Sequence, residues 1–490
     1  MIRLKSILLP LTLLMPMLGC QQTKLVFTDT QAPVISQFES IEGAPEFSPF
    51  AESSTEDGSG SGGAQAEVTP LASNFTLHTF PASHSGLHYI SLVLINSQRP
   101  FKDIDVLNTA LYHRANWLSA IQPLSCIESL KVRAGMHSIA LQMACPPDEL
   151  EPALSLLAAS WQDSAFDELD IDTVRRQLKL NKHINAYTGS EIEKVWARQI
   201  LGNSHPYNLA LNNKALQQAL TQSDLNQIQD TILPGSGWHL LISGQASEGS
   251  GRLEALAVRL AQRLPHSRST RAQTTIGSDT ASTDAVSKRR LFLIDAPGAV
   301  QTQVRVGYRL PLADDPLNCH TLASWLGRSF SGRLYFDLRE MRGLTYGIYG
   351  RCYDNPQART LKFYGSTQLQ HTGAFVSGIL DHLKLAMDEP VQERELGAIK
   401  RFEKSKYLLT KRSMAAMQAN YIKRLTLAQG SDEVMRQQQA IATLSPSKLQ
   451  QMAHGVFNVP PMILLRGDAD LIVEDLESKL PDWQIILLTP

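Results

Sequence analysis

The sequence has almost no excess of charge of either sign. Its 490 residues include 46 lysines and arginines against 47 aspartates and glutamates, which gives a formal net charge of −1. Nucleic acids are polyanions, and proteins that bind them present a basic face. Nothing in this chain supplies such a face, so a nucleic acid is excluded as the main partner.

Several catalytic and metal-binding motifs are also missing. The chain contains no Cys-x-x-Cys pair, no phosphate-binding glycine loop and no Gly-x-Ser-x-Gly elbow. The His-x-x-Glu-His motif, which places two zinc ligands and a general base on one helix face, does not occur either. His84 and His88 have a suitable spacing, but Ser85 and Gly86 would break a helix between them, which favours two surface histidines.

The N-terminus has the features of a targeting signal. Two basic residues precede an apolar run at 7–18, which is too short to span a bilayer and has signal-peptide proportions. The Leu-Gly-Cys sequence that ends at Cys20 resembles the bacterial lipobox, in which the cysteine carries lipid. Residues 1–20 are therefore expected to be a lipoprotein signal, and Gln21 favours a lipid anchor in the outer membrane, on the periplasmic side. Residues 21–72, rich in serine and glycine around 52–63, predict a flexible tether.

Four cysteines remain besides Cys20. Cys126 and Cys145 flank a predicted hairpin and would lie opposite one another across it, so a cross-strand disulfide is one interpretation. Cys319 and Cys352 lie in another predicted domain and can pair with each other. Four free, buried thiols that act as small hydrophobic side chains are the alternative.

The rest of the chain repeats one plan twice. In each half a strand, a helix, a hairpin and a series of helices follow one another, and each half ends on a strand. Residues 73–265 and 290–490 form the two halves, and a Ser/Thr/Arg-rich linker at 266–289 joins them. This order predicts an α+β fold in which helices pack on one face of each sheet.

The second half contains a specific resemblance. The segments 295–308 and 329–347, which includes Arg-Glu-Met-Arg-Gly-Leu-Thr-Tyr-Gly at its end, and the His-Pro-Tyr sequence at 205–207, resemble the M16 (pitrilysin/insulinase-like) metallopeptidase family. The resemblance spans roughly residues 75–475. It implies two homologous LuxS/MPP-like α/β sandwich domains with mostly antiparallel sheets. Gly343 sits where the end of a helix requires a positive φ.

The resemblance implies a substrate-binding role for two residues. The family carries an arginine and a tyrosine that hold the backbone of a bound peptide, and Arg339 and Tyr346 match them. A guanidinium and a phenol can donate hydrogen bonds to the main-chain carbonyls of a peptide, whatever the side chains of that peptide are. Without the family, Arg339 would be interpreted as a solvated helix charge and Tyr346 as a strand residue of the core.

The first half lacks the zinc ligands that active members carry. By resemblance, Thr109 and Tyr112 stand where the family has its first histidine and its glutamate, and His113 is kept. Asn181 lies near the position of the last glutamate ligand. Zinc requires three protein ligands and an open position, so we expect this chain to bind no metal and to lack catalytic residues. An alternative is that His113 and His183 both face the cleft that holds zinc in active members of the family, and that they bind a ligand there.

Three functions are compatible with these residues. The first is a non-catalytic, substrate-binding subunit that pairs with a zinc-bearing M16 peptidase, so that zinc and hydrolysis belong to the partner. The second is a non-enzymatic peptide-binding or scaffold protein of the envelope. The third is an autonomous peptidase with an unusual metal site. Division of labour within the family favours the first.

Overall fold

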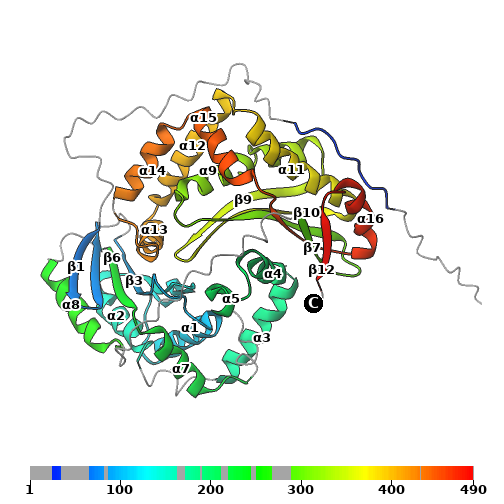
Figure 1. Cartoon of the computed structure of the whole chain (residues 1–490). Coiled ribbons are helices and arrows are strands. Elements are labelled where there is room, and N and C mark those ends of the chain that lie inside the picture. The colour runs from blue at the N-terminus through cyan, green and yellow to red at the C-terminus, as the bar shows by residue number, and fades with distance from the viewer. Residues whose placement is uncertain are drawn as a thin grey trace, which may run out of the picture.

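The chain folds into two halves, each built on a six-stranded sheet (Figure 1). The computed structural model describes residues 25–34, 66–81, 86–162, 171–187, 190–210, 219–243, 250–266, 289–430 and 432–488. Cys20 and most of the predicted linker lie outside these residues. Among the described helices, none combines the length and apolar character that a bilayer span requires.

The first half has the strand order β1-β2-β6-β3-β5-β4. Only β2 and β6 run parallel to each other, and the remaining pairs are antiparallel. The elements are β1 Glu67–Ala72, β2 Phe75–Phe80, β3 His88–Ile95, α1 Ile104–Ile121, η1 Ile127–Ser129, β4 Lys131–Ala134, β5 Ser138–Cys145, η2 Pro147–Glu149, α2 Leu150–Ala159, α3 Ile171–Tyr187, α4 Ser190–Leu201, α5 Pro206–Ala210, α7 Gln222–Ile232, β6 Gly237–Ser243 and α8 Ser250–Arg263.

The second half repeats this arrangement with the order β12-β7-β11-β8-β10-β9. Strand β7 runs parallel to β11 and β12, and the other pairs are antiparallel. The elements are β7 Arg290–Asp295, β8 Gln301–Leu310, α9 Pro316–Gly327, α10 Arg333–Tyr335, the π-helix η4 Phe336–Met341, β9 Thr345–Asn355, β10 Ala358–Gln368, η5 Leu369–His371, α11 Thr372–Asp388, α12 Glu393–Thr410, α13 Met414–Thr426, α14 Asp432–Ala442, α15 Pro446–Phe457, β11 Met462–Gly467, α16 Ala469–Lys479 and β12 Gln484–Leu488.

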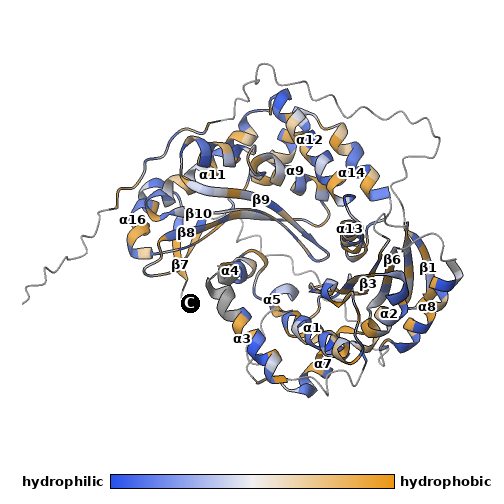
Figure 2. Cartoon of the chain, turned by 180° about the vertical axis from the view of Figure 1, so that it is seen from behind, coloured by the Kyte–Doolittle hydropathy of each residue, from blue (hydrophilic) through white to orange (hydrophobic). Residues whose placement is uncertain are grey.

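The predicted α+β architecture with two mostly antiparallel sheets is confirmed. Each half has its own apolar core between one sheet face and the helices that cover it. Outer helices such as α8 and α14 carry both hydrophobic and hydrophilic residues, as helices with one buried face do (Figure 2). Helix α9 lies so close to β9 that a Cβ on Gly327 would meet the backbone nitrogen of Gly350 at 2.1 Å, so this contact requires glycine.

The opposite face of each sheet is covered by a helix of the other half. Helix α13 of the second half packs on the first sheet, where Ile422 joins an apolar cluster with Phe80, Val93 and Leu241. Helix α4 of the first half packs on the second sheet, where Trp196 lies in a cluster with Leu464. In Figure 1 each of these helices lies between its own half and the sheet of the other. The two halves therefore exchange covering helices.

One boundary of the first half differs from that expected, and capping residues mark the start of two helices. Strand β1 pairs with β2, so the first half begins before residue 73, inside the predicted tether. Helix α7 is capped by Thr221 through a capping box with Asp224. Helices α12 and α13 are separate, because the side chain of Ser413 accepts a hydrogen bond from the backbone of Ala416 and begins α13.

A second part of the predicted tether lies against the second half. Residues 25–34, here called the N-terminal strap, run along the outer surface beside α11 and α16 (dark blue in Figure 1). The backbone nitrogen of Thr28 donates to the carbonyl of Gln370 at 2.9 Å. The guanidinium of Arg342 donates to the carbonyls of Gln31 and Ala32 at 2.9 and 2.8 Å. The strap is thus bound through its main chain.

Candidate functional site

Arg339 and Tyr346 lie on either side of a tight helix-to-strand connection. Arg339 is in the last turn of η4, and Tyr346 is the second residue of β9. Between them Gly343 has a φ of 63°, and its backbone nitrogen donates to the carbonyl of Arg339 at 3.1 Å. The positive φ that the sequence predicted for Gly343 is confirmed, and it turns the chain directly from helix into strand.

Both side chains are accessible to a ligand. The phenol of Tyr346 is 83% exposed. The side chain of Arg339 is 35% exposed, and its nearest carboxylate, that of Glu340, lies 3.6 Å away. The guanidinium stacks 4.7 Å from the ring centre of the buried Tyr335, which holds it over a fixed surface. The pair therefore presents hydrogen-bond donors outward from a rigid base.

Buried ion pairs hold this base in place. The guanidinium of Arg333 makes a bidentate contact with Glu395, with nitrogen–oxygen distances of 2.9 Å, and Trp325 donates to the same carboxylate at 2.8 Å. One turn later, Asp337 accepts from both Arg342 and His382 at 2.8 Å. Such paired and hydrogen-bonded charges fix the orientation of the helix that carries Arg339.

The residues that the resemblance aligns with zinc ligands make other interactions in the structure. Thr109 is buried, and its hydroxyl donates to the carbonyl of Asp105 at 2.9 Å. Tyr112 is 46% exposed, and its ring contacts that of His113. Asn181 accepts a hydrogen bond from the amide of Gln177 at 2.9 Å. The side chain of His183 lies outside the described residues.

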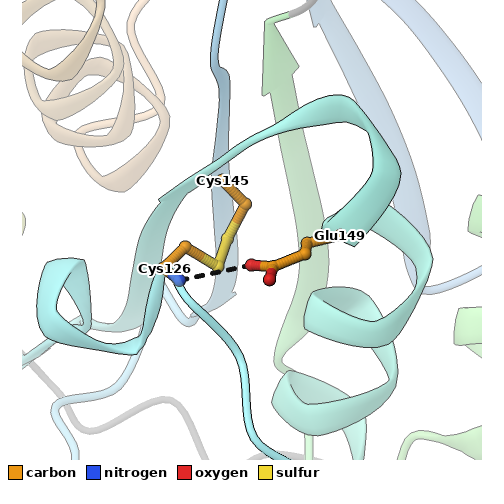
Figure 3. A group of neighbouring side chains, drawn as sticks. All are labelled: Cys126, Cys145 and Glu149. Atoms are coloured by element: carbon orange, nitrogen blue, oxygen red, sulfur yellow. Dashed lines mark hydrogen bonds between the residues drawn. A yellow bond between two sulfur atoms is a disulfide. The ribbon is translucent and has the colours of Figure 1, made fainter.

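One group of potential metal ligands occurs in the described part of the chain, and it is a disulfide beside a carboxylate (Figure 3). Cys126 and Cys145 are joined by an S–S bond of 2.04 Å, so neither sulfur is available as a thiolate ligand. Glu149 accepts hydrogen bonds from the backbone nitrogens of Ser125 and Cys126 at 2.9 and 3.2 Å. The bond from Ser125 is the main cause that lowers the pKa of Glu149. This group is a structural brace.

The two disulfides differ in how they relate to their sheets. Cys126 precedes the turn η1 and is not part of β4, which begins at Lys131. The Cys126–Cys145 disulfide, one of the two interpretations of the sequence, is present. It joins the end of β5 to the turn before β4 rather than two paired strands, because β4 does not extend back to Cys126. Cys319 and Cys352 are also bonded, with Cα atoms 5.5 Å apart, and they tie α9 to β9.

A cavity of about 590 Å³ lies between the two halves, and we call it the interdomain cavity. Its wall comes from the β4–β5 turn, α4, α5, the end of β9, β10 and α13. Within the wall, Lys362 forms an ion pair with Glu193, which also accepts from Arg305 at 2.7 Å. These two cations and these hydrogen bonds lower the pKa of Glu193 against the opposing effect of burial, which is the largest single influence.

A hydrogen-bonded chain of polar groups closes one end of the cavity. The Nδ1 of His137 faces the carbonyl of Asn96 at 2.7 Å, and its Nε2 lies 2.8 Å from the hydroxyl of Tyr207. That hydroxyl accepts from the backbone nitrogen of Gln357, at the tip of the β9–β10 hairpin. Burial lowers the pKa of His137 and raises that of Tyr207, so both groups stay neutral and join the halves.

The sequence did not single out this cavity. Four residues carry its charge and come from four elements: Glu193 of α4, Asp354 of β9, Lys362 of β10 and Lys423 of α13. The only signal was a lysine at position 362 between Leu361 and Phe363 in a strand that is otherwise buried. A charged side chain in such a strand requires a partner.

Comparisons with known proteins agree with this architecture. Residues 219–402 match the family model described as "Peptidase M16 inactive domain". No curated protein matches the sequence. A protease from Helicobacter pylori is similar in structure, with a TM-score of 0.65 and 14% identity over 82% of this chain and 99% of that one.

Two further structures are similar. A peptidase M16 inactive domain from Pseudomonas fluorescens has a TM-score of 0.64 and 15% identity, over 82% of this chain and 97% of that chain. A chain of complex III2 from Candida albicans with Inz-5 bound has a TM-score of 0.64 and 12% identity, over 85% and 100% of the two chains. At these identities the structures show a shared fold. Together, the match of residues 219–402 to the family model and the shared fold show that the chain is similar to the inactive domain of M16 peptidases.

Proposed function

We propose that this protein is the substrate-binding subunit of a two-component M16 zinc peptidase in the bacterial envelope. In this proposal Arg339 and Tyr346 hold the backbone of an extended peptide while a zinc-bearing partner subunit hydrolyses it. Zinc is then the partner's cofactor. The observation that carries the proposal is the exposed Arg339–Tyr346 pair on a rigid, buried base, in a chain whose positions for zinc ligands hold Thr109, Tyr112 and Asn181.

The chemistry of the pair suits main-chain recognition. An arginine stacked on a ring keeps its N–H groups in one plane, and a phenol at the start of the following strand β9 supplies a further donor. Peptide carbonyls accept such bonds whatever their side chains are. This arrangement supports binding of unstructured peptides without a strict sequence requirement.

A lipid on Cys20 would hold the protein at the outer membrane, on its periplasmic side. Between Cys20 and the N-terminal strap lie only residues 21–24, and a chain extends by at most about 3.6 Å per residue. The body would thus be held close to the bilayer. Mass spectrometry of the membrane fraction tests this directly, because a diacylated cysteine at the mature N-terminus is expected.

The proposal predicts peptide cleavage only when both subunits are present. The chain, purified in detergent, is assayed alone and with an M16 protein of the same organism that carries His-x-x-Glu-His, on a generic unstructured peptide. We expect cleavage in the mixture, and a loss of about 10-fold to 100-fold for R339A or Y346A if each removes one or two hydrogen bonds to the substrate. R401A, on the exposed face of α12, is the matched control.

Other outcomes point elsewhere. Activity of the lone chain that a chelator abolishes would overturn the proposal in favour of an autonomous metallopeptidase. If the mixture is inactive but the chain binds the peptide through Arg339, a non-enzymatic peptide-binding protein of the envelope becomes the better account.

A further inference from the structure

The wall of the interdomain cavity is largely apolar. Side chains from both halves contribute to it, so it exists only while the halves are docked. A volume of about 590 Å³ lies within the range of sites for small ligands. The apolar part of the wall includes Met136, Trp196, Ile200, Ile422 and Leu427.

Among the described charges around the cavity, one cation has no ion-pair partner. Asp354 is paired with Arg359 at 2.8 Å, and Glu193 is shared by Arg305 and Lys362. A neighbouring pair joins Lys406 and Glu403 at 3.0 Å, behind the wall.

Lys423 is the remaining cation. Its ammonium group makes no ion pair or hydrogen bond with any residue of the described chain. The residue is exposed at the cavity, and partial burial of its ammonium group is the main cause that lowers its pKa. Asp354 opposes this effect and Lys406 adds to it. A bound anion beside Lys423 would compensate the positive charge of its ammonium group.

We propose that the interdomain cavity binds a small carboxylate with a hydrocarbon body. The carboxylate pairs with Lys423, and the hydrocarbon lies along Trp196 and Ile200 of α4, which also line the cavity. This ligand chemistry occurs in a fatty acid and in the C-terminal end of an apolar peptide. The cavity is not lined by Arg339 or Tyr346, so this site is separate from the proposed peptide-binding pair.

The first test is calorimetric titration of the full chain with decanoate. We expect saturable binding, and a Kd about 10-fold weaker or more in K423M, because a charge-assisted hydrogen bond is lost. Methionine keeps the length of the side chain, so packing changes little. K448M, which removes an exposed lysine from the start of α15, is expected to leave the Kd unchanged.

A second variant tests the hydrocarbon part. Ala419 lines the cavity and is exposed to it, so A419F fills space without disturbing a core, and we expect it to weaken decanoate binding. N-acetyl-leucyl-leucine and its amide distinguish the two sources of the carboxylate. If this acid binds through Lys423 and decanoate does not, the ligand is a peptide terminus.

Two results would overturn the inference. One is that neither acid binds the wild-type chain at millimolar concentration. The other is that both bind equally well to the wild type and to K423M. Peptide cleavage that depends on Arg339 would stand in either case.

Discussion

At the scale of single residues, the placement of Arg339 and Tyr346 depends on buried charges. Arg333 is 1% exposed and Glu395 is 4% exposed, and the Nε and Nη2 of the arginine each donate to one carboxylate oxygen. Removing one partner of a buried pair leaves the other desolvated and uncompensated, which is far more harmful than losing a surface pair.

E395Q is therefore expected to lower the free energy of unfolding by about 3 to 5 kcal/mol. Urea denaturation followed by tryptophan fluorescence measures the change, because Trp325 donates to the same carboxylate. E340Q, at a half-exposed carboxylate next to Arg339, should change stability by less than about 0.5 kcal/mol. Equal effects of the two substitutions would contradict the role given to this pair.

The sequence identified Arg339 and Tyr346 because a motif carries them, but not the residues that support them. Arg333 and Glu395 are separated by two helices and a hairpin, and nothing local distinguishes them from solvated helix charges. Their pairing depends on how α10 and α12 pack. In the same way, the pairing of Lys362 with Glu193 depends on how the two halves dock. Hydrophobic periodicity predicts single helices and strands, but it does not predict this docking.

At the scale of elements, α13 joins the two halves through a polar contact within an apolar interface. The hydroxyl of Tyr421 lies 3.0 Å from Nδ1 of His78, whose Nε2 lies 3.0 Å from Nδ1 of His239. Burial first, and the neighbouring His239 second, lower the pKa of His78 to about 3. Burial lowers the pKa of His239 to about 4.

These shifts predict a loss of stability in mild acid. The pKa values of both histidines in the folded chain lie below the unfolded value of 6.5. At a pH between these values the histidines are protonated in the unfolded chain and neutral in the folded chain. The stabilisation is complete above pH 6.5 and falls as the pH drops, by about 1.4 kcal/mol per pH unit for each histidine. Urea denaturation between pH 6.5 and 5 should show this slope, and H78Q should reduce it. An unchanged slope in H78Q would sink this assignment.

The end of a helix or strand could be predicted where a single residue determines the local backbone conformation. Other boundaries were harder to predict. Gly343 ends its helix as expected because only glycine tolerates that φ readily. The break before α13 has a local cause as well, because Ser413 is a good cap. Strand β1 was missed because it is short, contains a proline and is mostly exposed, so it has little hydrophobic signal.

At the scale of the whole molecule, the exchange of α4 and α13 makes each half part of the other's core. Ile422 is buried against the first sheet, whereas Ala415 on the same helix is exposed. I422D places a charge without a partner in that interface. We expect it to undock the halves and to increase the radius of gyration in small-angle X-ray scattering, while A415D leaves the radius unchanged. A compact I422D protein would show that other contacts suffice to hold the halves.

The exchanged helix also bears on how the protein is made. The last strand of the first sheet ends at Ser243, and α13 begins at Met414. A ribosome that adds about 5 to 20 residues per second synthesises the intervening segment in roughly 10 to 30 seconds. Throughout that time the apolar face around Val93 and Leu241 has no cover. The nascent chain should therefore depend on a chaperone that shields this face until the second half has been translated.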